Sequence, residues 1–309
     1  MRIGFGSWSS FVVALAWVLM LALAAGAQSG GAKSHENYFV STQWVADHLK
    51  DSSLVLLAVG EKSEYDRGHI PGARYLDYNR ISTPHGSGLM LELPPVEQLV
   101  KVFEELGVSD SSRVVVYFSS EWVTPTARAF LTLDYLGLRD RISYLDGGMP
   151  AWRKEGRPVS TDKPSFAKGQ LTPHPRSDVI AKLDDVQHEL FKPGIALVDV
   201  READCYGSAG CYSERPGHIP GAVNIPWEEL VGDDLKLKST DELRKIFQSA
   251  GVKPGDEVIA YCHIGQRASF VYLVSRYLER NARLYDGSFE EWGGRRDLPL
   301  ETSAKLGNR

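Results

Sequence analysis

Short apolar runs and longer helix-like stretches alternate along this chain, and they occur twice in the same order. The corresponding segments are Leu54–Ala58 and Ile195–Val200, then Arg113–Tyr117 and Glu257–Tyr261, and finally Thr124–Leu136 and Gln266–Leu278. Short buried strands that alternate with helices are typical of βαβ units, which build a parallel sheet covered by helices on both faces. The pattern therefore predicts an α/β protein with two similar halves.

A repeated hexapeptide supports this duplication. Gly68–Ala73 reads GHIPGA, and the same six letters recur at Gly217–Ala222. Each half also has a matching Asp-Gly segment ahead of a tryptophan: Tyr144–Gly148 before Trp152, and Tyr285–Ser288 before Trp292. Such self-similarity indicates two copies of one folding unit. Because both copies have a histidine at this position, His69 and His218, we interpret the two as structural turn residues.

The length of the chain suits two domains. Its 309 residues exceed one average domain, and each half is long enough to bury a core of its own. We expect domains over 36–160 and 176–301, each a central parallel sheet flanked by helices. The linker, 161–175, lies within Ser160–Ser177, a stretch rich in proline, serine and charge.

The N-terminus has the pattern of a secretory signal peptide. Arg2 precedes the apolar run Phe11–Ala25, and Ala25–Ala27 reads AGA, a small-residue cleavage site. The alternative is an uncleaved membrane anchor, but the run is shorter than the ~20 residues that a spanning helix needs. We therefore expect cleavage after Ala27, a periplasmic or secreted protein, and no membrane contact once residues 1–27 are removed. The mild net charge of −5 gives no reason to expect nucleic acid as a partner.

The two copies differ where chemistry is possible. Cys262 follows the second strand of the C-terminal half, where the N-terminal half has Phe118. At the first strand, Asp199 and Arg201 correspond to Ala58 and Gly60. The second half thus keeps polar groups that the first half lacks, so we expect the first half to be catalytically inactive.

The segment that begins at Cys262 is a candidate nucleophile loop. A strand, a tight turn with one glycine and then a helix point backbone N–H groups and the positive helix end at an anion. We expect the binding residues to be His263, Ile264, Gly265, Gln266, Arg267 and Ala268. Cationic groups beside a thiol favour the nucleophilic thiolate, so no separate general base is needed. The alternative is a buried structural cysteine.

The loop C-x-x-G-x-R, the D-x-R triplet at Asp199–Arg201, the GHIPGA turns and the Asp-Gly segments together resemble the tandem rhodaneses. The resemblance covers nearly the whole chain after the signal peptide. It implies a thiosulfate sulfurtransferase in which Cys262 takes the outer sulfur from thiosulfate and holds it as a persulfide. The acceptor would be cyanide or another thiophile, such as a thiol or a thioredoxin-like protein. Neither a cofactor nor a metal ion is implied.

The resemblance also assigns supporting roles. The N–H groups of the loop would cradle the persulfide and Arg267 would hold the anionic donor, while Asp199 and Arg201 would form an ion pair beneath the loop. Cys205 stands where many tandem members carry a substrate-side arginine. Donor binding should therefore depend on Arg267 and a cationic His263.

Cys205 and Cys211 lie six positions apart, just before and within an insert, Gly207–Arg215, that the first half lacks. In an oxidising compartment we expect one bridge and one free thiol. Two other interpretations stay open: a pair of free thiols that resolves the Cys262 persulfide, and a metal site, which two cysteines alone leave incomplete.

Three other functions compete with thiosulfate sulfur transfer. Cysteine-dependent phosphatases of similar fold use a C-x5-R loop, whereas only four residues separate Cys262 from Arg267. A non-catalytic binding module would not need an intact cysteine loop. A 3-mercaptopyruvate sulfurtransferase is the alternative within the family, but its users tend to carry a loop of small polar residues. Cationic His263 and Arg267 suit dianionic thiosulfate better.

Overall fold

The computed structural model describes residues 38–84, 86, 88–207, 211 and 213–302, together with residues 1 and 4. The expected signal peptide, residues 1–27, lies outside the described residues except for 1 and 4. Among the helices of the described segments, none combines the length and the apolar character that crossing a bilayer requires.

The first repeat is a five-stranded parallel sheet with the strand order β1-β5-β4-β2-β3. Its strands are β1 (Phe39–Val40), β2 (Leu54–Val59), β3 (Arg74–Leu76), β4 (Arg113–Phe118) and β5 (Ile142–Leu145). Its helices are α1 (Thr42–His48), α2 (Lys62–Arg67), α3 (Val96–Glu105), α4 (Val123–Tyr135) and α5 (Gly148–Lys154). The central strands β2 and β4 are buried on both faces, which explains why their sequences are almost wholly apolar.

The second repeat has the same topology, with the order β6-β10-β9-β7-β8. Its strands are β6 (Ile180–Ala181), β7 (Ile195–Asp199), β8 (Val223–Asn224), β9 (Glu257–Tyr261) and β10 (Ala282–Tyr285). Its helices are α6 (Leu183–Glu189), α7 (Ala203–Gly207), α8 (Thr240–Ser249), α9 (Ala268–Tyr277) and α10 (Ser288–Gly294). The predicted fold class, two parallel sheets flanked by helices, is confirmed.

The expected linker, 161–175, contains no helix or strand and runs along the first repeat. Gly169 N–H donates to Glu104 C=O at 2.8 Å, and Thr172 N–H donates to the Asp110 carboxylate at 2.8 Å. The proposed domain limits remain a prediction.

The repeated hexapeptide forms the same turn in both repeats. His69 Nδ1 lies 2.9 Å from Tyr65 C=O, and His218 Nδ1 lies 2.8 Å from Tyr206 C=O. Each ring also stacks on that tyrosine. These contacts are those of structural turn residues.

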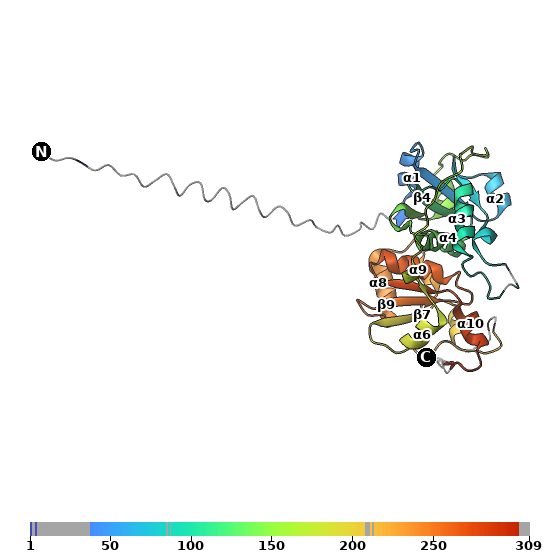
Figure 1. Cartoon of the computed structure of the whole chain (residues 1–309), viewed down its shortest axis with the longest axis vertical. Helices are drawn as coiled ribbons and strands as arrows, with labels where there is room; N and C mark the ends of the chain where they lie inside the picture. The colour runs from blue at the N-terminus through green and yellow to red at the C-terminus, as the bar shows by residue number, and fades with distance from the viewer. Residues whose placement is uncertain are drawn as a thin grey trace. The chain divides into compact units, whose positions relative to one another are not determined.

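Helices α4 and α9 pack against each other between the two sheets (Figure 1). Both helices are buried along most of their length, and one apolar core continues from the first repeat into the second. Tyr272 donates a hydrogen bond of 2.6 Å to the Asp134 carboxylate across this contact. The repeats therefore share a core rather than a thin polar interface.

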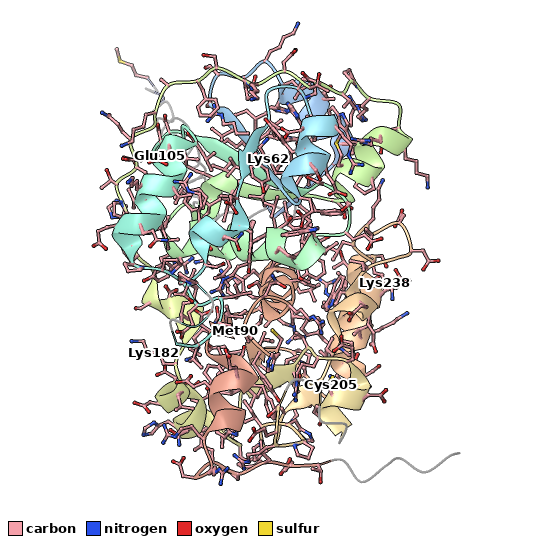
Figure 2. All side chains as sticks on the ribbon, turned by 90° about the vertical axis from the view of Figure 1, so that its right-hand side faces the viewer. Lys62, Met90, Glu105, Lys182, Cys205 and Lys238 are labelled. Carbon is pink, nitrogen blue, oxygen red and sulfur yellow. A yellow bond between two sulfur atoms is a disulfide. The ribbon has the colours of Figure 1, made fainter. Side chains whose placement is uncertain are left out.

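Each repeat also extends a loop over the other. Leu93 N–H, in the first repeat, donates to the Asp286 carboxylate at 3.0 Å, and Leu237 N–H, in the second, donates to the Asp146 carboxylate at 2.8 Å. Met90, in the same loop as Leu93, lies between the two repeats (Figure 2). The N–H of Met90 donates to the Glu290 carboxylate at 2.7 Å. A loop of the first repeat thus reaches the edge of the second sheet where Cys262 lies.

Candidate active site

Cys262 directly follows strand β9 and is 1% exposed. Its N–H donates to Ser288 Oγ at 3.2 Å, and its C=O accepts from Phe289 N–H at 3.0 Å. Ser288 in turn donates to Tyr285 C=O at 2.8 Å. The turn between β10 and α10 therefore fixes the backbone on both sides of the sulfur, which is the free cysteine of the described residues.

The loop that follows Cys262 leads into helix α9. Gly265 has φ +77°, and a Cβ at this position would lie 2.8 Å from Asp286 C=O. Both the left-handed backbone and this close approach require glycine. Ser269, in the first turn of α9, donates to Gly265 C=O at 3.0 Å. The loop is thereby held at the positive end of a ten-residue helix.

Cys262 lies in a cavity of about 300 Å³. Four of the predicted binding residues line this cavity: His263, Ile264, Gln266 and Arg267. The other two, Gly265 and Ala268, are buried behind the lining. The geometry thus brings the predicted loop residues together around the sulfur.

Sequence reasoning missed two residues that line the same cavity, Glu202 and Met90. Glu202 directly follows the Asp199–Arg201 triplet, so an acidic side chain near the cysteine could have been inferred from that position. Met90 comes from the first repeat, and no local pattern connects it with Cys262.

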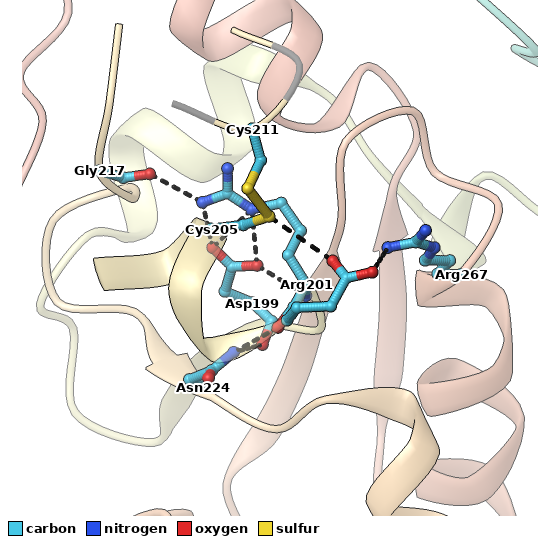
Figure 3. Close-up of a disulfide and its surroundings, with 8 residues drawn as sticks. Asp199, Arg201, Cys205, Cys211, Gly217, Asn224 and Arg267 are labelled. Atoms are coloured by element: carbon cyan, nitrogen blue, oxygen red, sulfur yellow. Dashed lines mark hydrogen bonds and ion pairs between the residues drawn. A yellow bond between two sulfur atoms is a disulfide. The ribbon is translucent and has the colours of Figure 1, made fainter. Parts of the chain in front are cut away.

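Asp199 and Arg201 form the predicted buried ion pair. Arg201 Nη2 lies 2.6 Å from Asp199 Oδ2 and also donates to Gly217 C=O at 2.8 Å. The guanidinium lies over the Phe289 ring, 3.9 Å from its centroid. Because Gly217 opens the repeated turn, the ion pair links the end of β7 to that turn (Figure 3). The contact with Phe289 links the pair to α10 as well.

Arg267, the expected donor-binding residue, is already paired with a carboxylate. Its Nη1 lies 2.6 Å from Glu202 Oε1 at the rim of the cavity (Figure 3). Burial disfavours the charge, but Glu202, and next a thiolate at Cys262, outweigh burial and raise the pKa of Arg267. Arg267 is therefore cationic at every relevant pH, and an anionic donor must compete with Glu202 for it.

The expectation of a cationic His263 is wrong. Burial lowers the pKa of the imidazole, and nearby Arg201 and Arg267 lower it further, against the opposite effect of Glu290. His263 is therefore neutral near pH 7. Among the described residues that line the cavity, the positive charge therefore comes from Arg201 and Arg267.

A third arginine reaches the site from the first repeat. Arg128, on α4, is fully buried and lies 2.6 Å from the Asp286 carboxylate. Its Nη2 also donates to Leu91 C=O at 2.9 Å. Burial opposes the charge, but Asp286 outweighs it and raises the pKa of Arg128, with a smaller contribution from a thiolate at Cys262. Arg128 thus joins the active repeat to the loop that carries Met90.

Cys205 and Cys211 are joined in a disulfide, with Cα atoms 5.2 Å apart. This is the first of the three interpretations of the pair, and in this state neither sulfur is a free thiol. Cys205 Sγ lies 3.6 Å from Glu202 Oε2, on the other side of that carboxylate from Arg267 (Figure 3). Among the described residues there is also no group of three histidine, cysteine or acidic side chains placed to hold a metal ion.

The corresponding place in the first repeat is filled. Phe118 is 0% exposed, and its ring lies against Gly148, where a Cβ would come within 2.8 Å of it. Ser120, in the loop that follows, donates to the Glu64 carboxylate at 2.9 Å. The first repeat has an aromatic plug where the second has a cysteine and a cavity.

The fold and this loop define a protein of two α/β repeats with one cysteine site, and comparison with known proteins gives the family. The model of the rhodanese-like domain matches residues 41–155 and 182–295. The sulfur carrier protein TtuD of Thermus thermophilus is 34% identical over 283 residues, which are 86% of this chain and 97% of that protein. A putative thiosulfate sulfurtransferase of Mycolicibacterium smegmatis is 33% identical, over 87% of this chain and 99% of the relative.

Solved structures agree with the sequence relatives. The crystal structure of SseA from Escherichia coli, described with the fold and mechanism of 3-mercaptopyruvate sulfotransferases, is 31% identical with a TM-score of 0.74. The match covers 82% of this chain and 98% of that one. The chain therefore belongs to the rhodanese family, as a sulfurtransferase with two rhodanese-like repeats.

Proposed function

We propose that this chain moves a sulfane sulfur from thiosulfate to a thiophilic acceptor through a persulfide on Cys262. The Cys262 thiolate attacks the outer sulfur of thiosulfate, the S–S bond of the donor breaks, and sulfite leaves with the bonding electron pair. The acceptor then attacks the outer sulfur of Cys262–S–S⁻ and restores the thiolate. No external oxidant or reductant is needed.

The observation that carries this proposal is a buried free cysteine in a small cavity at the start of a helix. The cavity is lined by Arg201 and Arg267 and backed by Arg128, so an anion on Cys262 is balanced by charge and by the N–H groups of the loop. A persulfide needs this environment because it stays anionic while it waits for the acceptor.

Thiosulfate is the proposed donor because two arginines, Arg201 and Arg267, line the cavity, and guanidinium groups suit a dianionic donor. The relative from Mycolicibacterium smegmatis, named a putative thiosulfate sulfurtransferase, supports this choice. 3-Mercaptopyruvate is the second candidate, which the similarity to SseA favours. Both donors lead to the same persulfide, so the choice changes the first step only.

Intact-protein mass spectrometry tests the proposal. The chain is incubated with thiosulfate or with 3-mercaptopyruvate, desalted and weighed. We expect a gain of one sulfur atom with thiosulfate, located on the peptide that contains Cys262, and loss of that sulfur when cyanide is added. A gain with 3-mercaptopyruvate alone would select the second donor, and no gain with either would overturn the persulfide.

We further propose that the sulfur transfer takes place outside the cytoplasm, on the strength of the signal-like N-terminus. Cyanide, a small thiol or a thioredoxin-like protein could serve as the acceptor there. Fractionation of cells that produce the full chain, with an N-terminal sequence of the mature form, tests the location. Mature protein that begins at Met1 in the cytoplasm would overturn it.

A further inference from the structure

A second cleft, of about 650 Å³, adjoins the cavity of Cys262. Met90 and His263 line both spaces, so the cleft opens toward the sulfur at these two side chains. The rest of its lining is 213–215, which follow the disulfide, and four residues of α10 or just beyond it: Glu290, Gly293, Gly294 and Arg296. Neither thiosulfate nor cyanide needs so large a space.

The walls of this cleft are fixed by contacts that leave its interior open. Arg215 extends along one wall, where its guanidinium donates to Gly293 C=O at 3.4 Å, to Leu298 C=O at 2.8 Å and to Arg295 C=O. The disulfide between Cys205 and Cys211 anchors the segment that leads into this wall. On the other side, Met90 N–H and the Glu290 carboxylate join the first repeat to α10.

Two opposite charges in the cleft are available to a ligand. Glu214 and Arg296 are both exposed, and neither makes an ion pair or a hydrogen bond with the part of the chain that the structure describes. Gly294, which also lines the cleft, faces open space, since a Cβ there would contact nothing within 4 Å. A bare backbone with one acidic and one basic side chain suits a small ligand that carries both charges.

The first repeat has a smaller hollow beside α5, the helix that corresponds to α10. This hollow, of about 400 Å³, is lined by Lys154, Glu155 and Lys236 among others. There Lys236 lies 3.6 Å from Glu155, so these charges are already paired. The first repeat also lacks the insert that forms the wall at 213–215. The larger cleft, whose acidic and basic side chains are unpaired within the described residues, is thus the one beside the cysteine.

We propose that this cleft is the acceptor subsite and that the acceptor is a small zwitterionic thiol, an amino-acid or short-peptide thiol. Arg296 would bind its carboxylate and Glu214 its ammonium group, with the sulfur directed past Met90 and His263 to Cys262. The acceptor thiolate RS⁻ attacks the outer sulfur of the anionic Cys262–S–S⁻, the S–S bond of the persulfide breaks, and Cys262–S⁻ and R–S–S⁻ result. This inference rests on the proposed persulfide.

Single-turnover kinetics on the full chain test the subsite. Cys262 is loaded with thiosulfate, excess donor is removed, and loss of the sulfur is followed by mass spectrometry with cysteine, cysteamine, N-acetylcysteine or cyanide. The disulfide is checked in the same spectra. Cysteamine lacks the carboxylate, and N-acetylcysteine lacks the ammonium group. Each rate constant is compared between the parent chain, Arg296→Gln and Glu214→Gln.

We expect Arg296→Gln to lower the cysteine rate, relative to the cyanide rate, about fivefold, which corresponds to about 1 kcal/mol for an exposed ion pair. The same variant should not change this ratio for cysteamine, and Glu214→Gln should not change it for N-acetylcysteine. Arg295→Gln is the matched control, because Arg295 is a neighbouring arginine that pairs with Asp297 instead; it should change no rate.

The outcomes separate this inference from the proposed function. Equal effects on all three thiols, or no effect on any of them, would overturn the zwitterion subsite while the persulfide stands. A parent chain that accepts sulfur but releases it to cyanide and to no thiol would also overturn the subsite. Failure of the parent chain to accept sulfur at all would overturn the proposed function instead.

Discussion

Asp146 of the first repeat and Asp286 of the second occupy the same place, just after the strands β5 and β10. Each accepts a backbone N–H from the loop of the other repeat, at 2.8 and 3.0 Å. Their other neighbours differ. Asp286 is paired with Arg128 of α4. Counted back equally from the helix ends at Leu136 and Leu278, the position of Arg128 in α4 corresponds to Phe270 in α9.

The difference shows what the first repeat contributes. Its own site is closed by Phe118, yet it gives the second repeat a buried cation, Arg128, and a cavity residue, Met90. Phe270 of the second repeat packs against the first repeat, with its ring centroid 6.1 Å from that of Tyr144. Burial raises the pKa of Asp146 and outweighs the opposite effects of the Leu237 N–H and of Lys236, whereas Asp286 forms a buried ion pair with Arg128. The repeat without a nucleophile is thus part of the active site of the other.

The largest effect should come from Cys262→Ser. A serine hydroxyl is a far poorer nucleophile than a thiolate, so thiosulfate:cyanide turnover should fall by more than about a thousandfold. Because serine is nearly isosteric, the far-UV circular dichroism and the thermal midpoint should stay close to those of the parent. Residual turnover within a factor of ten of the parent would show that Cys262 is not the nucleophile that distinguishes the second repeat from the first.

The next effect should be on stability, from Arg128→Met. The change leaves the Asp286 carboxylate without its ion-pair partner in a buried place, and loss of one partner of such a pair costs about 3 kcal/mol or more. Urea unfolding measures this free energy. Arg141→Met is the control, because Arg141 is an exposed arginine of the same repeat, just before β5; it should change this free energy by less than about 0.5 kcal/mol. Equal effects of the two variants would mean that Arg128 does not join the repeats.

The same residues show which features of the fold and of the site can be predicted from the sequence. The paired apolar runs and the repeated GHIPGA predict both sheets, because strand period and turn chemistry are local properties. The place of Cys262 at a strand end before a helix is predicted for the same reason. Arg128 and Met90 are not predictable in this way, since their roles depend on contacts between repeats. The neutral state of His263 is not predictable from the loop either, because the sequence of the loop does not show that the ring is buried.

A smaller effect is expected from Arg267→Gln. Loss of the cation at the cavity mouth should raise KM for thiosulfate about tenfold, because a hydrogen bond to a charged group contributes about 1.5 kcal/mol or more. The parent KM should also rise with ionic strength, and the variant's should do so less. Arg244→Gln, on the surface of α8, serves as the control. A fall in kcat with KM unchanged would assign Arg267 to a different step.

His263→Asn should act mainly at acid pH. Burial lowers the pKa of His263, so the ring is neutral at pH 7.5 and its loss should change KM for thiosulfate by less than about twofold. Below the usual histidine range the ring of the parent gains a proton, and the added positive charge should lower KM. The variant should lack this fall in KM toward acid pH. A large rise in KM at pH 7.5 would show that the ring is charged there after all.

The smallest effect on catalysis should come from the aromatic plug of the first repeat. Phe118→Leu keeps an apolar side chain of similar volume against Gly148 and Tyr144, so the loss of stability should be about 1 kcal/mol. Phe118 lies in the sheet of the first repeat and is absent from the lining of the Cys262 cavity. Thiosulfate:cyanide kcat should therefore stay within about twofold of the parent. A large drop in kcat, without a drop in thermal midpoint to explain it, would mean that the first repeat tunes the nucleophile through its own closed site as well as through Arg128 and Met90.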